Sequence, residues 1–115
     1  MNALMNPQQV ITMSSREIAR LTGKMHKDVM RDIRLMLEQV GETSAQFCAD
    51  LPDVYGRPQP VYFLPKDLTI TLIAGYRADL RRRIVVRWME LEEKQQPVAL
   101  PRTFAEVLRL AADDL

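Results

Sequence analysis

One glycine, Gly23, separates two segments with helical character, and this arrangement constrains the fold more than any other feature of the sequence. Ser14 stands three residues before Glu17, which is the spacing of a capping box at a helix N-terminus. We therefore expect a helix to begin after Ser14, with Glu17 reaching back to the cap. Gly23 is expected to end that helix, because glycine readily takes the left-handed conformation that closes helix C-termini.

The segment 26–40 is predicted to form a second helix. Its apolar residues recur every three to four positions, so they share one side. They are Val29, Ile33, Met36, Leu37 and Val40. Lys27, Arg31 and Arg34 have the same period on another side and form a basic face. Two such helices around a glycine turn are typical of a helix-turn-helix. The spacing of the expected core residues matches that motif only in part. The alternative is an ordinary pair of amphipathic helices whose lysine and arginine side chains are only solvated.

A turn rich in glycine and proline lies between two segments rich in aromatic and β-branched residues, which predicts a β-hairpin over about 47–64. Pro58 and Pro60 fit only near the tip or on an edge, because proline cannot donate to a sheet. Arg57 is predicted at the tip. A hairpin behind a helix-turn-helix acts as a wing, whose basic tip contacts phosphate or the minor groove. The alternative is an edge hairpin that only covers the core.

Two further helices are expected after the hairpin. The third begins at 65–67, where proline and aspartate suit a first turn, and it ends at Gly75. Its buried residues are expected to be Leu68, Leu72 and Ile73. The fourth helix has an apolar stripe with the period of a helix. That stripe consists of Leu80, Ile84, Trp88 and Leu91.

Arginines crowd the fourth helix, at positions 77, 81, 82, 83 and 87. Neighbouring guanidiniums repel one another, and contact with phosphate would relieve that repulsion. The alternative is a solvated face neutralised by Glu38, Glu42 and Asp79. The net charge of +1 hides this concentration, because basic blocks at 16–37 and 56–88 oppose acidic blocks at 38–55 and 89–115. A charged patch is therefore expected even though the whole chain is nearly neutral.

Several classes of protein are excluded by what the sequence lacks. One cysteine and one histidine provide neither an intrachain disulfide nor a zinc cluster, so no metal or cofactor is expected. The lack of a disulfide also indicates a protein of the reducing cytoplasm. The sequence has no glycine-rich phosphate loop and no Gly-x-Ser-x-Gly elbow, which argues against an enzyme. No uncharged stretch is long enough to span a bilayer. Residues 1–12 are interpreted as a flexible leader.

Several blocks of sequence carry a resemblance to a known family. They are TMSSREIA at 12–19, TGKMHKDVMRDI at 22–33, GR at 56–57, PVY at 60–62, LPKDLT at 64–69 and GY at 75–76. In this order, the blocks resemble the phage regulatory protein Rha family over 13–93. The resemblance implies a regulator from a temperate phage or prophage and supplies no catalytic residues.

The remaining segment divides into a linker and a short helix. Pro97 and Pro101 interrupt helical continuity, so 94–102 is expected to be a linker. A second capping box and an apolar stripe predict a helix over 103–115. The stretch 101–112 resembles the opening of a C-terminal antirepressor module on related phage proteins, here truncated. A helix of this kind also suggests pairing of two copies as a homodimer.

These observations predict an α+β, mostly helical domain of winged helix-turn-helix type over 13–93, with one β-hairpin. The leading hypothesis is a regulator that binds double-stranded DNA in the bacterial cytoplasm, with its second helix in the major groove. The predicted contact residues are Lys24, His26, Lys27, Arg31, Arg34, Arg57, Arg81, Arg82 and Arg83.

The alternative function is that of an antirepressor, which binds a repressor or host regulatory protein instead of DNA. Exposed apolar residues on the second helix, such as Met30 and Leu35, would favour this hypothesis over phosphate contact.

Overall fold

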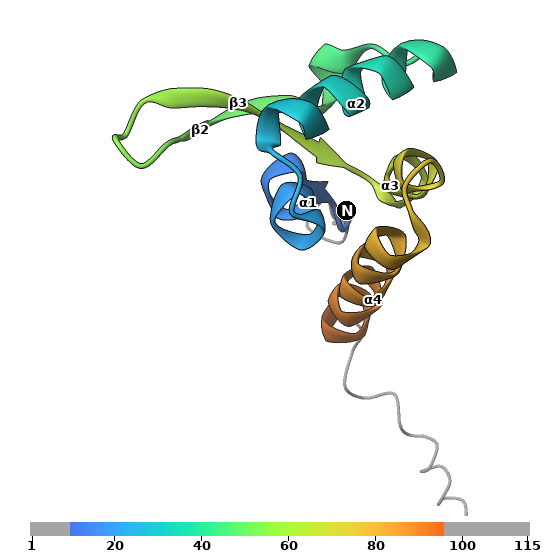
Figure 1. The fold of residues 1–115 in the computed structure, drawn as a ribbon. Helices are drawn as coiled ribbons and strands as arrows, with labels where there is room; N and C mark the ends of the chain where they lie inside the picture. Colours follow the sequence, from blue (N-terminus) through green and yellow to red (C-terminus); the bar gives the residue numbers. More distant parts are fainter. Residues whose placement is uncertain (1–9, 96–115) are drawn as a thin grey trace, which may run out of the picture.

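Four helices surround a small antiparallel sheet in the computed structural model, which describes residues 10–95 (Figure 1). In chain order the elements are β1 (Met13–Ser14), α1 (Ser15–Thr22), α2 (His26–Val40), the 3-10 helix η2 (Ser44–Phe47), β2 (Cys48–Pro52), β3 (Pro58–Leu64), α3 (Lys66–Ile73) and α4 (Ala78–Gln95). The predicted α+β, mostly helical fold is confirmed. The predictions for most of the leader, for most of the linker and for the helix over 103–115 lie outside the described residues.

Helix α1 begins and ends where the sequence indicates. The Ser14 hydroxyl accepts a hydrogen bond from the backbone N–H of Glu17 at 3.1 Å, and Gly23 closes the helix with φ +76°. The predicted bond from the Glu17 side chain back to the cap residue is wrong. The Glu17 carboxylate lies 2.6 Å from Nε of Arg87 on α4 instead. An ion pair with a distant guanidinium thus replaces the local bond to the cap.

Loss of the cap at Ser14 is expected to destabilise the domain modestly. Ser14→Ala removes the acceptor for the Glu17 N–H, which should lower the free energy of unfolding by about 1 kcal/mol. Urea unfolding measures the change. Thr43→Ala is the control, because Thr43 is the N-cap residue of the short helix η2 and its side chain makes no cap hydrogen bond. Equal losses in the two variants would contradict the capping role.

Helix α2 has the predicted bounds and buries most of the predicted stripe. Val29, Ile33, Met36 and Leu37 are all buried, and the sharp stop at Gly41 comes from a left-handed C-cap with φ +80°. Val40 was wrongly included in the stripe. It is 46% exposed, because it is the last residue of the helix and lies beyond the side chains that cover the others.

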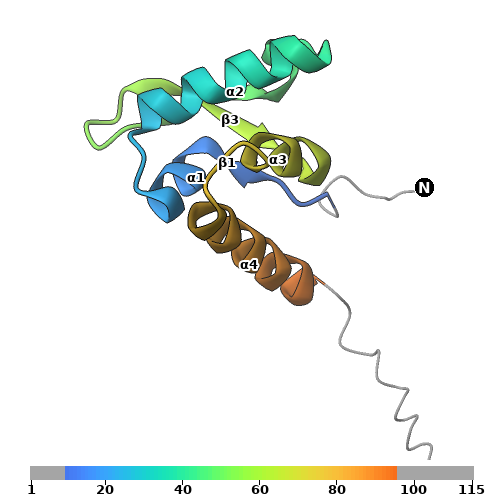
Figure 2. The same cartoon turned by 45° about the vertical axis from the view of Figure 1, so that its right-hand side comes forward.

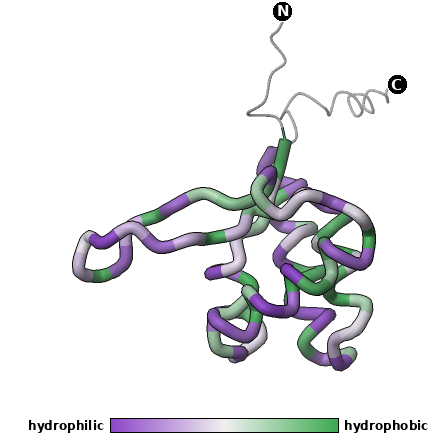
Figure 3. The backbone as a smooth tube through the Cα atoms, turned by 90° about the horizontal axis from the view of Figure 1, so that it is seen from above, coloured by the Kyte–Doolittle hydropathy of each residue, from purple (hydrophilic) through white to green (hydrophobic). Residues whose placement is uncertain are grey.

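The β-hairpin is confirmed, with a shorter first strand than the sequence suggests. Phe47 belongs to η2, and β2 pairs antiparallel with β3 from Cys48↔Tyr62 to Pro52↔Pro58. Strand β1 adds only the pairs Met13↔Leu64 and Ser14↔Phe63, on the other side of β3. The outer half of β3 therefore has a strand on one side alone, which is where proline is tolerated. The hairpin extends away from the helices as an arm (Figure 3).

Helices α3 and α4 complete the core. Leu68, Leu72 and Ile73 of α3 are buried, as predicted, but the helix ends at Ile73 through Ala74, and Gly75 has no left-handed φ. Gly75 is therefore not the terminator. In α4, Ile84 and Trp88 are buried, whereas Leu80 and Leu91 at the two ends of the stripe are only partly covered.

The helices lie in layers, with α1 between α2 and α4 (Figure 2). Helix α4 continues through Gln95, two residues into the segment expected to be a linker. Side chains from β1, α1, α2, β3, α3 and α4 meet in one hydrophobic core. Two helices around a glycine turn, followed by a protruding hairpin, are compatible with a winged helix.

Candidate nucleic-acid interface

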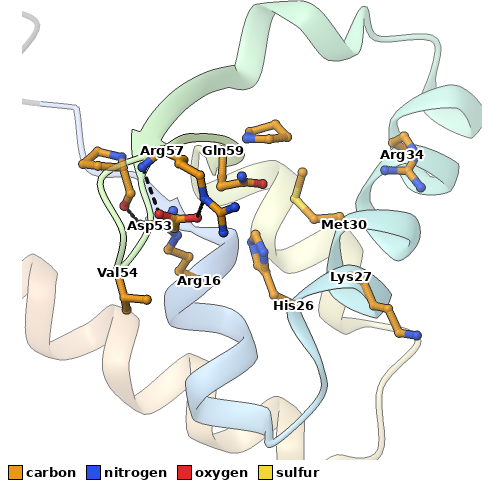
Figure 4. A pocket seen from close by; sticks show the side chains of 11 residues that line it. Arg16, His26, Lys27, Met30, Arg34, Asp53, Val54, Arg57 and Gln59 are labelled. Carbon is orange, nitrogen blue, oxygen red and sulfur yellow. Dashed lines mark hydrogen bonds and ion pairs between the residues drawn. The ribbon is translucent and has the colours of Figure 1, made fainter.

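A groove of about 910 Å³ runs between α2 and the hairpin, and one edge of it is formed by α1 (Figure 4). It is open to solvent along its length. Its walls carry cations from all three elements. The lining residues are Arg16, His26, Lys27, Met30, Arg34, Pro52, Asp53, Val54, Arg57, Gln59 and Pro60.

Four of the predicted contact residues line this groove, namely His26, Lys27, Arg34 and Arg57. They come from the second helix and from the hairpin, which are separated in sequence by the acidic block at 38–55. Lys27 and Arg34 are exposed and take part in no ion pair within residues 10–95. Two uncompensated cations on one wall make the groove attractive to an anion.

Arg16 is a groove residue that sequence reasoning missed. Its Nη1 donates to the carbonyl of Pro52 at 3.1 Å and its Nη2 to the carbonyl of Leu51 at 3.3 Å, so it joins α1 to the end of β2. A cation in the first turn of a helix faces the positive end of the helix dipole, which is unfavourable. That misplaced charge is the signal in the sequence that Arg16 serves a contact outside its own helix.

His26 is held at the point where α1, α2 and β3 meet. The buried Ser15 hydroxyl accepts from the N–H of Tyr62 at 3.0 Å and lies 2.8 Å from Nε2 of His26. Burial, and then the Arg16 guanidinium, lower the pKa of His26 below its ordinary value of 6.5. The ring is therefore neutral at pH 7, and a hydrogen bond joins its Nε2 to the Ser15 hydroxyl. His26 thereby fixes the start of α2 against the sheet.

The chain contains one histidine, so the titration of His26 can be followed without overlap from another imidazole. The imidazole NMR resonances are expected to titrate with a midpoint below 6.5, since the pKa of His26 is lowered. Its contribution to stability is complete above pH 6.5 and is lost as the pH falls through the lowered value, because the unfolded chain binds the proton more readily. His26→Asn should remove this part of the pH dependence. A midpoint at or above 6.5 would contradict the arrangement.

Lys24 and Asp32 form a separate cluster on the side of α2 away from the hairpin. Lys24 Nζ lies 4.8 Å from the centre of the Tyr76 ring and 3.5 Å from the Asp32 carboxylate, and the Tyr76 hydroxyl donates to Asp32 at 3.0 Å. Burial, together with Asp32, raises the pKa of Tyr76, so the phenol keeps its proton. Asp32 and the groove residue Met30 are two positions apart, which places them on nearly opposite sides of the helix.

Arg31 lies on the exposed side of α2 but is partly neutralised. Its guanidinium is 3.2 Å from the Asp28 carboxylate and 4.0 Å from that of Asp32. Arg31 does not line the groove. The basic face predicted from the spacing of Lys27, Arg31 and Arg34 is therefore uneven, with its uncompensated charge at Lys27 and Arg34.

The arginines of α4 lie outside the groove. Arg81 donates to the carbonyl of Tyr76 at 2.9 Å, which places it near the Lys24 cluster, and Arg83 donates to the carbonyl of Leu21 at 3.2 Å. Arg82 is exposed, and within residues 10–95 it has no hydrogen bond or ion pair. The three arginines thus lie outside the groove, and two of them are held by the carbonyls of Tyr76 and Leu21.

Arg77, which lies just before α4, and Arg87, within α4, are both neutralised by acidic neighbours, of which only Asp79 was expected. Arg77 pairs with Asp79 at 3.2 Å, as expected, but Arg87 pairs with Glu17 at 2.6 Å and Glu90 at 3.2 Å. Within residues 10–95, Glu38 and Glu42 pair with none of these arginines. The acidic loop therefore does not mask the basic helix.

Other kinds of site find no support in the described part of the chain. Residues 10–95 hold no group of three His, Cys, Asp or Glu side chains that could bind a metal ion. No helix in this range is long and apolar enough to cross a bilayer.

The fold and the groove are compatible with the class of winged-helix regulatory domains. The chain belongs to the phage regulatory protein Rha family, whose model matches residues 13–93. This is a family of phage regulators and not a known enzyme family. An uncharacterized protein of Haemophilus influenzae is 34% identical over 89 residues, covering 74% of this chain and 51% of that protein. The chain thus spans about half the length of that relative. No solved structure matches the chain.

Proposed function

We propose that this phage regulator is a transcription factor that binds double-stranded DNA through α2 and the hairpin. The observation that carries the proposal is the groove between them, where exposed and uncompensated Lys27 and Arg34 face Arg57 across one open space. The regulatory family supports a nucleic-acid or protein partner. The place of action is then the cytoplasm of the bacterial host.

Helix α2 is the element that would read the sequence. An α-helix with its side chains is about 10–12 Å wide and fits the major groove, which is about 12 Å wide. Lys27 and Arg34 are two turns apart on the exposed face of α2, so both would point into the major groove of the DNA. Arginine recognises guanine through two hydrogen bonds, whereas lysine more often contacts phosphate as a point charge. We therefore assign base contact to Arg34 and phosphate contact to Lys27.

The two flanks of α2 would contact the phosphate backbone. The hairpin carries Arg57 on one flank, and Lys24 and Arg81 lie on the other. Arg82 is exposed next to Arg81 and would add a further phosphate contact. Such contacts fix the position of a protein on the duplex and carry no sequence information of their own.

A salt titration tests the proposal. If about five phosphates are neutralised, a fourfold increase in salt concentration should weaken duplex binding about 500-fold, because condensed counterions are released on binding. Fluorescence anisotropy of a labelled duplex with the full chain measures the affinity at each salt concentration. An affinity that is absent, or that does not change with salt, would overturn the proposal.

The second candidate function is an antirepressor that binds a protein. Leu35 favours it, since this leucine is 52% exposed on α2 beside Arg34, whereas Met30 is partly covered inside the groove. Retention of an acidic protein partner on the immobilised chain, with no retention of duplex DNA, would select this function. Leu35→Ser would then abolish binding of the protein partner. Lys27→Ala would leave the apolar contacts between the chain and that partner in place.

A further inference from the structure

The outer end of the hairpin exposes two large side chains that do not belong to the hydrophobic core. Val54 is 92% exposed and Tyr55 is 78% exposed, the highest values among the large hydrophobic residues of the described chain. They lie at the end of the arm, far from the hydrophobic core (Figures 1 and 3). Hydrophobic residues at such a position contribute nothing to burial on folding, so a contact outside the domain is their expected role.

The tip is held in one conformation by Asp53. Its carboxylate accepts from the backbone N–H groups of Tyr55 at 2.8 Å and Arg57 at 2.9 Å, and the Gly56 N–H donates to the Asp53 carbonyl at 2.9 Å. Gly56 has φ +79°, a left-handed conformation that side chains other than glycine rarely adopt. Val54 and Tyr55 are therefore presented by a tight, closed turn.

The only cation of the tip is largely compensated. Nε of Arg57 lies 3.2 Å from the Asp53 carboxylate, and its guanidinium lies 5.1 Å from the centre of the Tyr55 ring. The hydrogen bond from the Arg57 N–H, together with the other donors at the turn, lowers the pKa of Asp53, so this carboxylate stays ionised at pH 7. With Asp53 and Arg57 offsetting each other, the outermost residues of the tip, Val54 and Tyr55, present an apolar and aromatic surface.

We infer that the tip of the hairpin enters the DNA minor groove and that Val54 and Tyr55 wedge into a base step, partly unstacking it. This inference rests on the proposed function and deepens it. Apolar wedges of this kind kink the duplex toward the major groove. The partner is duplex DNA and not a protein pocket, because Val54 lines the same groove as Lys27 and Arg34 and faces whatever binds there.

The reach of the arm agrees with this placement. Strands β2 and β3 pair over the five positions from Cys48↔Tyr62 to Pro52↔Pro58, so the ribbon is about 14 Å long before its turn begins. A major groove and the adjacent minor groove are separated by about half a helical turn, or about 17 Å along the axis. With α2 in the major groove, the turn then lies over the next minor groove. A minor groove about 6 Å wide must open to admit the tip, which favours kinking.

A base-stacking probe tests the wedge. The probe is a 30-base-pair duplex with a central segment of alternating A and T, which carries 2-aminopurine, between flanks that contain G·C pairs for Arg34. TA steps unstack easily, and 2-aminopurine fluoresces more strongly when unstacked. The full chain is expected to raise this fluorescence on binding. In the variant Val54→Ser with Tyr55→Ser the increase should vanish and the affinity fall about tenfold.

Two controls separate the wedge from other effects. Tyr55→Phe keeps the aromatic face and should retain the fluorescence increase. Ile70→Ser removes an apolar side chain that is 52% exposed on α3, away from the groove, and should behave like the unaltered chain. Circular dichroism verifies that each variant is folded, which is expected because the Asp53 bonds to the tip backbone are unchanged.

The outcomes distinguish this inference from the proposed function. Salt-dependent binding with no change in 2-aminopurine fluorescence would overturn the wedge and leave the DNA-binding function standing. The wedge is likewise overturned if the serine variant binds and unstacks the probe as the unaltered chain does, or if it loses only the binding of a protein partner. No binding of the full chain to any duplex would overturn both.

Discussion

Replacing both Lys27 and Arg34 with alanine is expected to weaken duplex binding about a hundredfold and to leave the stability of the domain unchanged. Both side chains are exposed and form no ion pair within residues 10–95, so their loss removes no ion pair from the fold. Each lost phosphate contact should also reduce the salt slope by about 1. Anisotropy titrations at several salt concentrations measure both quantities, and urea unfolding verifies the stability.

The control must remove the same charge from elsewhere on the surface. Arg20→Ala with Lys66→Ala does so, because Arg20 on α1 and Lys66 on α3 are exposed and neither lines the groove. Arg20 pairs with Glu17, which keeps its ion pair with Arg87 when Arg20 is removed, and Lys66 pairs with Glu92 at the surface. Exposed pairs of this kind contribute little to stability. Equal loss of affinity in the two double variants would mean that the groove is not the binding surface.

Single substitutions distinguish residues that recognise the base sequence from residues that only bind the phosphate backbone. Arg34→Ala should relax the preference among sequences, because a bidentate guanine contact contributes about 1–3 kcal/mol of discrimination. Arg82→Ala should weaken binding to all sequences alike, since the contact proposed for Arg82 is to phosphate and not to a base. Selection of duplexes from a random pool with each variant reveals the difference.

Replacing Trp88 with alanine is expected to have the largest effect on stability. Trp88 is 6% exposed and belongs to the hydrophobic core, at the centre of the α4 stripe. Truncation of a buried aromatic residue leaves a cavity and costs about 3–5 kcal/mol. Domains of this size are stable by about 5–15 kcal/mol, so the loss would be a large part of the total. Urea unfolding monitored by far-UV circular dichroism measures it.

The adjacent residue provides the control. Met89 is 61% exposed, so Met89→Ala should change the free energy of unfolding by less than about 0.5 kcal/mol. Similar costs at positions 88 and 89 would contradict the packing of α4 against the core.

Local patterns in the sequence predicted the helices well because the relevant interactions are local. The bounds of α2 and the caps of α1 follow from apolar spacing, one serine and the glycines, all within a few residues. Gly75 misled the prediction, since the backbone at Ala74 already ends α3 without a left-handed residue. A glycine after a helix permits a left-handed cap but does not require one.

The arrangement of the site depends on contacts that no local pattern contains. Arg87 and Glu17 are 70 positions apart, and Arg16 reaches the end of β2 about 35 positions away. The sequence identified most of the cations of the groove but not which of them face one another. That Arg57 and Lys27 share a space while Arg81 lies on the other flank follows only from how the sheet and α4 pack around α1.

The first turn of α1 joins the two elements that frame the groove. Ser15 contacts both His26 and the Tyr62 backbone, and Arg16 contacts the carbonyls that end β2. Helix α2 and the hairpin are therefore held against each other through α1, so the conformational entropy of aligning them is lost when the chain folds and not when it binds a ligand. Affinity for a ligand that spans both then depends on two neighbouring residues that need not contact it.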